Sequence, residues 1–102
     1  NDKTECAAIK EVFKSHTSKL MISSTKSMHG HLIGGTGAVE LLACLLALND
    51  NVIAPTINYI KNDPECDLDV VPNTARQKTV TCVLSNSFAF GGLNAVLALK
   101  KC

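Results

Sequence analysis

Apolar side chains recur at helical spacing near the beginning of the chain, and charged residues occupy most of the opposite face. The apolar positions are Cys6, Ile9, Val12 and Phe13, and the charged positions are Lys10, Glu11 and Lys14. This pattern predicts an amphipathic helix that Asp2 or Thr4 caps. Leu20 to Ser24 follows it and predicts a short strand.

A second segment, from about Gly35 to Leu48, is apolar on every side of a helix. Such a helix is expected to be buried. Glu40 is its one charged residue, and an ionised carboxylate in apolar surroundings is costly unless a cation pairs with it. Lys26 is the nearest candidate in the sequence, so we expect an ion pair between Lys26 and Glu40.

Turn-forming residues dominate segment 49–78, beginning with Asn49-Asp50-Asn51, which is expected to end the helix. We expect this segment to be mostly loop. Thr79–Leu84 and Ala95–Leu99 have the β-branched and alternating apolar residues of strands. They predict a C-terminal hairpin with an enlarged polar and aromatic turn over residues 85–94.

The composition limits the functions that the chain can have. At 102 residues it has room for one compact unit, and no repeat or internal boundary divides it. Its 46% hydrophobic and 19% charged residues predict apolar surface that a partner covers. The formal charge is +1 and the basic residues are scattered, which argues against nucleic acid as a partner.

Membrane insertion and a disulfide framework are also disfavoured. The longest strongly apolar run, Ala38 to Leu48, contains Glu40 and is shorter than the ~20 residues of a membrane-spanning helix, so no membrane is expected as a partner. The cysteines are odd in number and lack CxxC spacing, which predicts reduced thiols in an intracellular compartment. They are Cys6, Cys44, Cys66, Cys82 and Cys102.

Candidate chemistry gathers between Ser24 and Gly37, where Lys26 and His31 lie among glycines. A neutral imidazole can donate a hydrogen bond to a thioester carbonyl and stabilise the enolate that forms when an adjacent carboxylate is lost. The alternatives are a core histidine, a surface lysine and an anion cradle at the start of the helix, although nucleotide-binding patterns are absent. His29 has a weaker claim to catalysis.

A later segment, Phe88-Ala89-Phe90-Gly91-Gly92, has the parts of a mobile aromatic flap. Its glycines would be hinges and a bulky ring would be the gate. The alternative is an ordinary hairpin turn with a packed phenylalanine.

Four motifs, Ser24–His31, Gly34–Glu40, Ala54–Asn58 and Ser85–Gly92, follow one another along the chain. Their order and spacing resemble the synthase II type of β-ketoacyl-acyl carrier protein synthases, the condensing enzymes of fatty acid synthesis. The resemblance covers essentially the whole chain. It implies an α/β fold, the C-terminal half of a thiolase-like fold with layered sheet and helices, in which residues 1–102 form the C-terminal ketoacyl synthase domain and the N-terminal half is absent.

The resemblance also assigns roles to residues of this chain. It implies that His31 assists malonyl decarboxylation, with Lys26 beside it in the catalytic set and Glu40 as the carboxylate neighbour of that lysine. Phe90 is the implied gate over the acyl pocket. The implied pocket or gate residues are Phe88, Phe90, Gly91 and Gly92, and the positions that hold a monovalent cation in some members are Glu40, Ser85 and Asn86. No other cofactor is implied.

By resemblance, the parent enzyme condenses malonyl carrier thioester with an acyl-enzyme and releases carbon dioxide. Its nucleophilic Cys belongs to the first half of the enzyme, and its other histidine belongs to a His-Gly-Thr motif upstream of Asn1. We therefore expect the 102 residues alone to be inactive. The implied partners are an acyl carrier protein that carries acyl and malonyl thioesters and a second subunit of a homodimer, in the cytoplasm of a bacterium or in a plastid or other organelle of a eukaryote.

Two readings compete with a fatty acid synthase. One is a polyketide-type ketosynthase, and the other is a non-catalytic partner subunit that resembles a chain-length factor. Family members usually have Gly where Ala89 stands and Thr or His where Leu93 stands. We expect both differences to stiffen or reshape the flap and to alter the preference for acyl chains.

Overall fold

The computed structural model describes residues 1–102. The helical elements are α1 (Asp2–Phe13), the 3-10 helix η1 (Lys14–Lys19), α2 (Lys26–His29), the 3-10 helix η2 (Ile33–Gly35) and α3 (Thr36–Asp50). The strands are β1 (Val52–Ile53), β2 (Arg76–Gln77), β3 (Cys82–Ala89) and β4 (Leu93–Lys100). β1 pairs with β2 and β3 pairs with β4, and both pairs are antiparallel.

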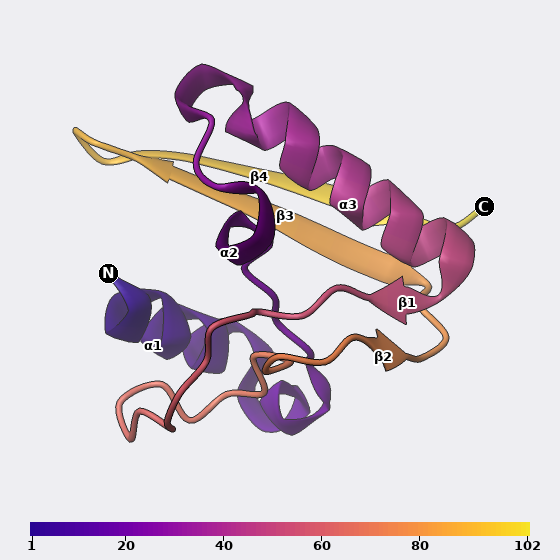
Figure 1. Cartoon of the computed structure of the whole chain (residues 1–102). Coiled ribbons are helices and arrows are strands. Elements are labelled where there is room, and N and C mark those ends of the chain that lie inside the picture. Colours follow the sequence, from indigo (N-terminus) through magenta and orange to yellow (C-terminus); the bar gives the residue numbers. More distant parts are fainter.

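The β3–β4 hairpin lies between the helices α3 and α1. α3 lies along the hairpin and packs against β3 (Figure 1). On β3, Ser85 hydrogen bonds to the Cys44 thiol of α3, whereas the Asn86 side chain donates to Glu5 Oε1 of α1 over 3.4 Å. Because successive side chains of a strand point to opposite faces, α3 and α1 lie on opposite sides of β3.

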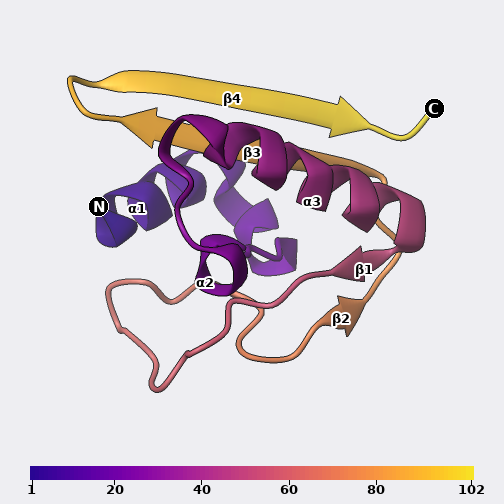
Figure 2. The same ribbon diagram turned by 45° about the horizontal axis from the view of Figure 1, so that its top comes forward.

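α3 and β3 run in opposite directions. The beginning of α3 and the end of β3 therefore lie at the same end of the molecule, as both views show (Figures 1 and 2). This arrangement brings the loop before α3 and the tip of the hairpin to one end of the fold, although they are far apart in the sequence.

The predicted first helix is confirmed, but its predicted caps are wrong. Asn1 is the N-cap residue, makes no side-chain capping bond, and accepts the Glu5 N–H with its carbonyl at 3.0 Å. The helix begins at Asp2, whose carboxylate therefore lies in the first turn, where the helix dipole favours it. Cys6 is buried as predicted, whereas Val12 is exposed.

The predicted second helix is also confirmed, and it ends where Asn51 adopts a left-handed conformation with φ of 54°. Its predicted burial on every side is wrong, because only Thr36 and Leu48 are buried. Among these residues β3 covers one side of α3, and Leu42, Leu45 and Leu46 on its other sides are exposed.

The stretch Ile33–Asp50 is long and apolar enough, with a mean hydropathy of 1.3 over 18 residues, to cross a membrane on length and composition alone. The core helices of water-soluble folds meet the same test. Here one side of the helix packs against β3, and Glu40 in its middle is ion-paired with Lys26.

The predicted strand at Leu20–Ser24 is wrong. The segment is extended, but its hydrogen bonds are isolated ones: Ile22 N–H donates to the Asp69 carbonyl at 2.9 Å and Ser24 N–H donates to Thr56 Oγ1 at 3.0 Å. No strand lies beside it to complete a ladder. The predicted loop over 49–78 is confirmed, apart from the two-residue strands β1 and β2.

The predicted hairpin is confirmed, but its enlarged turn is wrong. The ladder continues through Ser85↔Leu97 to Ala89↔Leu93, so the turn contains only residues 90–92. Ser and Asn side chains suggest a loop, yet main-chain pairing does not depend on side-chain polarity. Gly91 and Gly92 close the short turn with φ values of 84° and 80°, which a residue with a Cβ rarely adopts.

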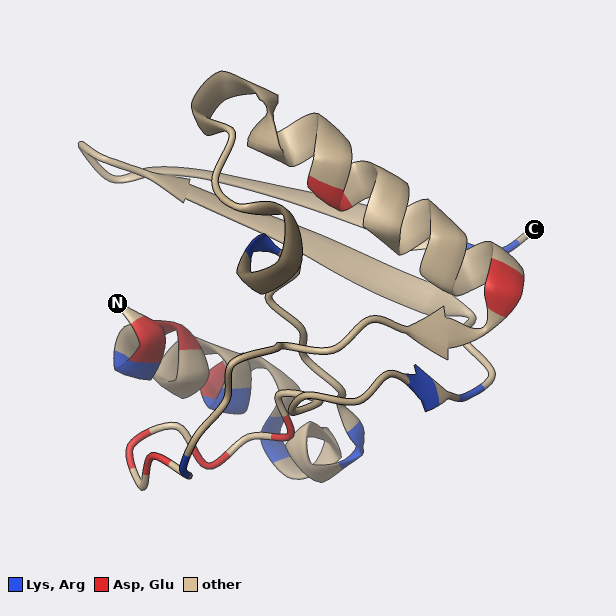
Figure 3. Ribbon diagram, in the orientation of Figure 1, with Lys and Arg blue, Asp and Glu red and all other residues tan.

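Much apolar surface is exposed on the hairpin and on α3. No charged residue occurs between Lys78 and Lys100, and Figure 3 shows the hairpin without charge until its last residues. The exposed apolar side chains of the hairpin include Leu84, Leu93, Val96 and Leu97. The predicted apolar surface is therefore present, and it lies over α3 and the hairpin.

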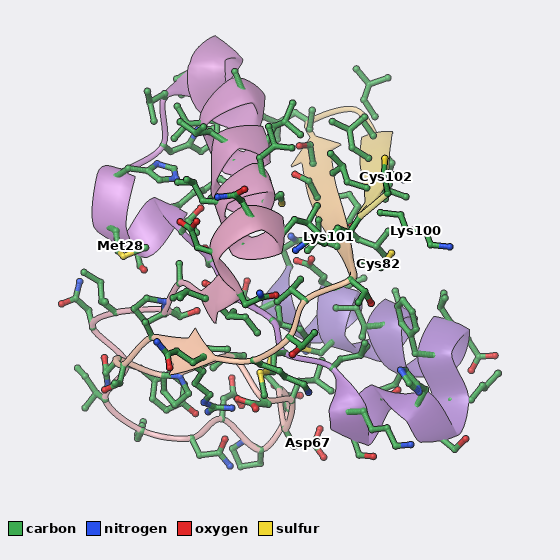
Figure 4. All side chains as sticks on the ribbon, turned by 90° about the vertical axis from the view of Figure 1, so that its right-hand side faces the viewer. Met28, Asp67, Cys82, Lys100, Lys101 and Cys102 are labelled. Atoms are coloured by element: carbon green, nitrogen blue, oxygen red, sulfur yellow. The ribbon has the colours of Figure 1, made fainter.

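The end of the chain caps α3. Lys101 Nζ donates to the Leu48 carbonyl over 3.3 Å, where a cation complements both the free carbonyls and the dipole of the helix. Figure 4 shows Lys101 directed toward the end of α3, while Lys100 points away from it.

Val71, at 0% exposure, is the most deeply buried side chain, and it adopts a left-handed conformation with φ of 49°. Asp69 supports this strained backbone: its Oδ1 accepts the Val71 N–H at 3.1 Å, and its other oxygen pairs with Arg76. The Val71 carbonyl accepts the Thr56 N–H at 2.9 Å. The arrangement anchors the loop that contacts the segment before α2. The Arg76 guanidinium and the Val71 N–H lower the pKa of Asp69, although partial burial opposes them.

Asp69→Asn is expected to destabilise the protein by about 1 kcal/mol at neutral pH, because the pair with Arg76 is partly exposed and screened. A lowered pKa means that this stabilisation is present above about pH 4, the ordinary Asp range, and is lost as the pH falls through the folded-state value. Thermal midpoints of the full-length wild-type and variant proteins from pH 7 to pH 3 should converge at the acidic end. Asp67→Asn, whose pair with Lys10 is exposed, is the matched control and should change the midpoint little. A deficit for Asp69→Asn that persists unchanged at pH 3 would contradict this.

Candidate active site

The segment before α2 is held by the loop that contains Thr56. Thr56 Oγ1 accepts the Ser24 N–H at 3.0 Å. Ser27 Oγ accepts the Ile57 N–H at 2.9 Å and donates to the Ser24 carbonyl at 2.9 Å. These bonds join the motif at 54–58 to the motif at 24–31, so α2 has a defined position in the fold.

Lys26 opens α2, and its ammonium pairs with Glu40 Oε1 of α3, as the sequence predicts. The Glu40 side chain is 13% exposed and the Lys26 side chain is 37% exposed, so the carboxylate is the more buried partner. Glu40 is the one acidic residue of α3 before its last residue, Asp50, and Figure 3 shows acidic colour within this helix. A carboxylate so placed is stable only with a partner, and the pair therefore joins α2 to α3.

His31 lies in the exposed loop between α2 and η2. Its Nδ1 accepts a hydrogen bond from the Ile33 N–H at 3.0 Å and lies 2.8 Å from Thr36 Oγ1. A main-chain N–H can only donate, so Nδ1 carries no proton. In the neutral ring the proton is therefore on Nε2, which is free to donate to a ligand.

Leu32, whose φ of −86° and ψ of 16° turn the chain back, directs the Ile33 N–H toward the ring, and Ile33 itself has a φ of 52°. A β-branched residue adopts this left-handed conformation at a cost of about 1–3 kcal/mol, and such strain concentrates at functional sites. Gly30, directly before His31, has a φ of 78° and a ψ of 177°, a conformation that is essentially restricted to glycine. The backbone around His31 is thus shaped to present an N–H to the imidazole.

The other histidines are placed differently. His29 donates from Nδ1 to the Gly30 carbonyl at 2.6 Å, and its Nε2 lies 3.0 Å from Thr25 Oγ1. Both of its nitrogens are therefore occupied by bonds within the same short segment. His16 lies exposed on η1. His31 is the histidine whose ring is held at Nδ1 while its Nε2 has no hydrogen-bond partner within the chain.

The flap predicted from Phe88 to Gly92 lies at the tip of the hairpin, at the same end of the fold as the His31 loop (Figures 1 and 2). Phe90 is fully exposed there and Phe88 is half-exposed. The Ala89↔Leu93 pair is the last of the ladder, so the flexible part of the predicted flap is only three residues long. The structure therefore brings the predicted gate and the His31 loop to the same end of the fold.

The predicted cation residues do not converge through their side chains. Glu40 is already compensated by Lys26, Ser85 faces Cys44, and Asn86 points to the opposite side of β3. No group of three or more His, Cys, Asp and Glu side chains could hold a metal ion. The monovalent cation at the positions Glu40, Ser85 and Asn86 stays a prediction.

The two cysteine thiols whose pKa the structure shifts, Cys6 and Cys44, are poor nucleophiles. Burial raises the pKa of Cys6 to about 11, with the Cys66 thiol beside it adding to the shift. Burial also raises the pKa of Cys44, against an opposing hydrogen bond from Ser85. A thiolate is disfavoured at both positions.

Thr36 is a residue of the site that the sequence did not predict. Thr36 is a small hydroxyl residue in the first turn of a predicted helix, and nothing in a linear pattern distinguishes it from a helix-start residue. The signal available was its spacing of five residues from His31, which brings the two together only when the loop between them doubles back.

Comparison with known proteins identifies the family. The family model "Beta-ketoacyl synthase, C-terminal domain" matches residues 1–60, more than half of the chain. The chain belongs to the β-ketoacyl synthase family. The resemblance drawn from the four motifs is thereby confirmed.

Relatives of this β-ketoacyl synthase domain extend the match to nearly the whole chain. "Nodulation protein E" of Rhizobium sp. is 52% identical over 99% of the chain, which covers 25% of that protein. "3-oxoacyl-[acyl-carrier-protein] synthase 2" of Synechocystis sp. is 50% identical over 99% of the chain, covering 24% of that protein. The chain therefore spans about a quarter of the length of these relatives.

Solved structures confirm the fold class. A chain of "The ishigamide ketosynthase/chain length factor" superposes with a TM-score of 0.93 at 46% identity, over 100% of this chain and 25% of that one. A chain of a complex titled as a type II polyketide synthase acyl-carrier protein with its ketosynthase bound to a hexaketide has a TM-score of 0.93 at 35% identity, over 96% and 24%. The C-terminal part of a ketosynthase, as predicted, is the architecture of this chain.

Lys26→Met is expected to cost about 1–3 kcal/mol of unfolding free energy in the full-length protein, because it leaves a mostly buried carboxylate without its cation. Glu40→Gln in the Lys26→Met background should recover most of that loss. A double-mutant cycle on unfolding free energies measures the coupling between the two residues. Losses that simply add would show that the pair does not hold α2 to α3.

Proposed function

We propose that the protein to which this β-ketoacyl synthase domain belongs is a 3-oxoacyl-acyl carrier protein synthase, and that His31 performs the decarboxylation half of its reaction. The observation that carries the proposal is the hydrogen bond from the Ile33 N–H to His31 Nδ1, which leaves the proton on Nε2. A ring held in this form has an Nε2–H that can donate a hydrogen bond to a thioester carbonyl.

The proposed step uses this donor as follows. The thioester oxygen of a malonyl group accepts the Nε2–H hydrogen bond, the bond to the terminal carboxylate breaks, and carbon dioxide leaves. The electron pair of the broken bond becomes an enolate whose negative oxygen His31 stabilises. The enolate carbon then attacks the acyl thioester on the nucleophilic Cys, which by resemblance belongs to the rest of the protein, and the Cys sulfur leaves as a thiolate.

Lys26 joins this proposed catalytic set as the cation that holds α2 to α3 through Glu40. The ion pair sets where α2 ends, and the His31 loop begins directly after it. Loss of the pair would leave His31 bonded to Thr36 and Ile33 but would free the loop on its α2 side. We therefore expect Lys26 to matter to turnover through position.

The acyl carrier protein is the proposed bearer of both substrates. In its support, the name of the synthase relative contains the acyl carrier protein, and a structural neighbour is a complex of a ketosynthase with such a carrier. The proposed assembly is a homodimer of the full-length protein in a reducing intracellular compartment. The uncharged hairpin and the exposed leucines of α3 are the surface that the rest of that assembly would cover.

A polyketide-type function is the second candidate, because both solved neighbours named above come from polyketide-type or related ketosynthases. A chain-length factor, which by resemblance lacks the nucleophile, would condense nothing. The presence of His31 with a free Nε2 favours a catalytic subunit. The residue at the nucleophile position of the full-length protein distinguishes a catalytic subunit from a chain-length factor.

His31→Ala in the full-length protein is expected to slow decarboxylation of malonyl carrier thioester by about 10²–10³-fold, the usual cost of losing one oxyanion donor. Release of carbon dioxide is the measurement. His16→Ala, an exposed histidine on η1, is the matched control and should retain the wild-type rate. Equal rates for wild type and His31→Ala would exclude the proposed role.

Ala89→Gly is expected to widen the range of acyl chains that the full-length enzyme accepts. Ala89 forms the last pair of the hairpin ladder, and a glycine there would let the pair open and extend the turn that carries Phe90. Condensation rates with acyl carrier thioesters of increasing length measure the effect. Identical chain-length profiles would rule out a gating role for this stiffness.

A further inference from the structure

Thr36 is one of the few buried polar residues of the chain, and its burial is not explained by helix capping. It is the first residue of α3 and is 5% exposed. The N-terminus of α3 has no side-chain capping bond. A buried hydroxyl needs a partner, and the partner of Thr36 Oγ1 is His31 Nδ1 at 2.8 Å.

The direction of this bond follows from its neighbour. A hydroxyl can donate or accept, but the Ile33 N–H already donates to the same Nδ1 at 3.0 Å. The nitrogen therefore has no proton to give, and Thr36 donates to it. Two donors then share one acceptor, and a proton on Nδ1 would oppose both.

The two donors differ in how firmly they are held. Ile33 is exposed at the start of the three-residue helix η2, and its backbone is in a strained left-handed conformation. The Thr36 hydroxyl belongs to a 15-residue helix that packs on β3 and is ion-paired to α2. α3 therefore provides the firmly held donor to the imidazole, and η2 provides the second donor.

We propose that Thr36 is a positioning residue of the condensing site, whose hydroxyl fixes the plane of the His31 ring and keeps its proton on Nε2. The inference rests on the proposed decarboxylation by His31. Thr36 does not touch the substrate in this role, because it acts through the ring nitrogen opposite the one that would bind the thioester. Its chemistry is that of an outer partner that selects the tautomer of a catalytic histidine.

The test uses Thr36→Val, which keeps the shape of the side chain and removes its hydroxyl, in the full-length protein. The decarboxylation kcat should fall about tenfold with little change in KM, as expected for the loss of one hydrogen bond that orients the donor. Thr36→Ser, which restores the hydroxyl, should recover most of the rate. Thr36→Ala, which removes the methyl group together with the hydroxyl, is a second variant without the hydroxyl.

A spectroscopic measurement separates this role from a structural one. In protein labelled with ¹⁵N-histidine, the wild-type His31 should show an unprotonated Nδ1 and a protonated Nε2, with His31→Ala identifying the signals. Thr36→Val and Thr36→Ala should move both signals toward the average of the two tautomers. Thr36→Ser should restore them.

His31→Ala in the same decarboxylation assay distinguishes the two levels of the proposal. If His31→Ala retains the wild-type rate, the proposed function itself is wrong. If His31→Ala is slow while either folded variant without the hydroxyl keeps both the wild-type rate and the wild-type ¹⁵N signals, the proposed function stands and the role of Thr36 is overturned.

Discussion

A single carboxylate inside an apolar helix constrains this structure more than any other feature. Glu40 lies in the middle of α3, where an ionised group is stable only beside a cation, and Lys26 provides that cation from α2. The pair joins two helices that are otherwise connected by an exposed glycine-containing loop. His31 lies in that loop, so the position of this candidate hydrogen-bond donor depends on a charge requirement that is separate from its own chemistry.

Much of the apolar surface of the chain is not covered by other residues of the chain. α3 packs on β3 with one side, and the outer leucines of α3 and most of β4 have no cover within these residues. The uncharged hairpin carries Phe90 at its tip, at the end of the fold where His31 lies. The chain covers about a quarter of the length of its relatives. In a longer polypeptide, other segments can bury an apolar surface of this kind.

Several features were predictable because they depend on neighbours in the sequence. The apolar run from Gly35 to Leu48 requires a helix, its one acid requires a cation, and the alternating residues after Thr79 require paired strands. Two of the errors concern partners that are distant in the sequence, whereas the caps of α1 and the length of the hairpin turn are local errors. Leu20–Ser24 lacks a strand to pair with, and α3 lacks a second covering layer.

The sequence by itself determined the family, the helix α3, the Lys26–Glu40 pair and the choice of His31 as the candidate catalytic histidine. These features follow from motifs and charge requirements, which are properties of residue order. Only the tertiary structure decided which nitrogen of His31 carries the proton. That choice depends on the Ile33 N–H and the Thr36 hydroxyl reaching Nδ1 within 3.0 and 2.8 Å. Hydrogen bonds of this kind act over one atomic contact, and such contacts exist only after the loop has folded back onto the start of α3.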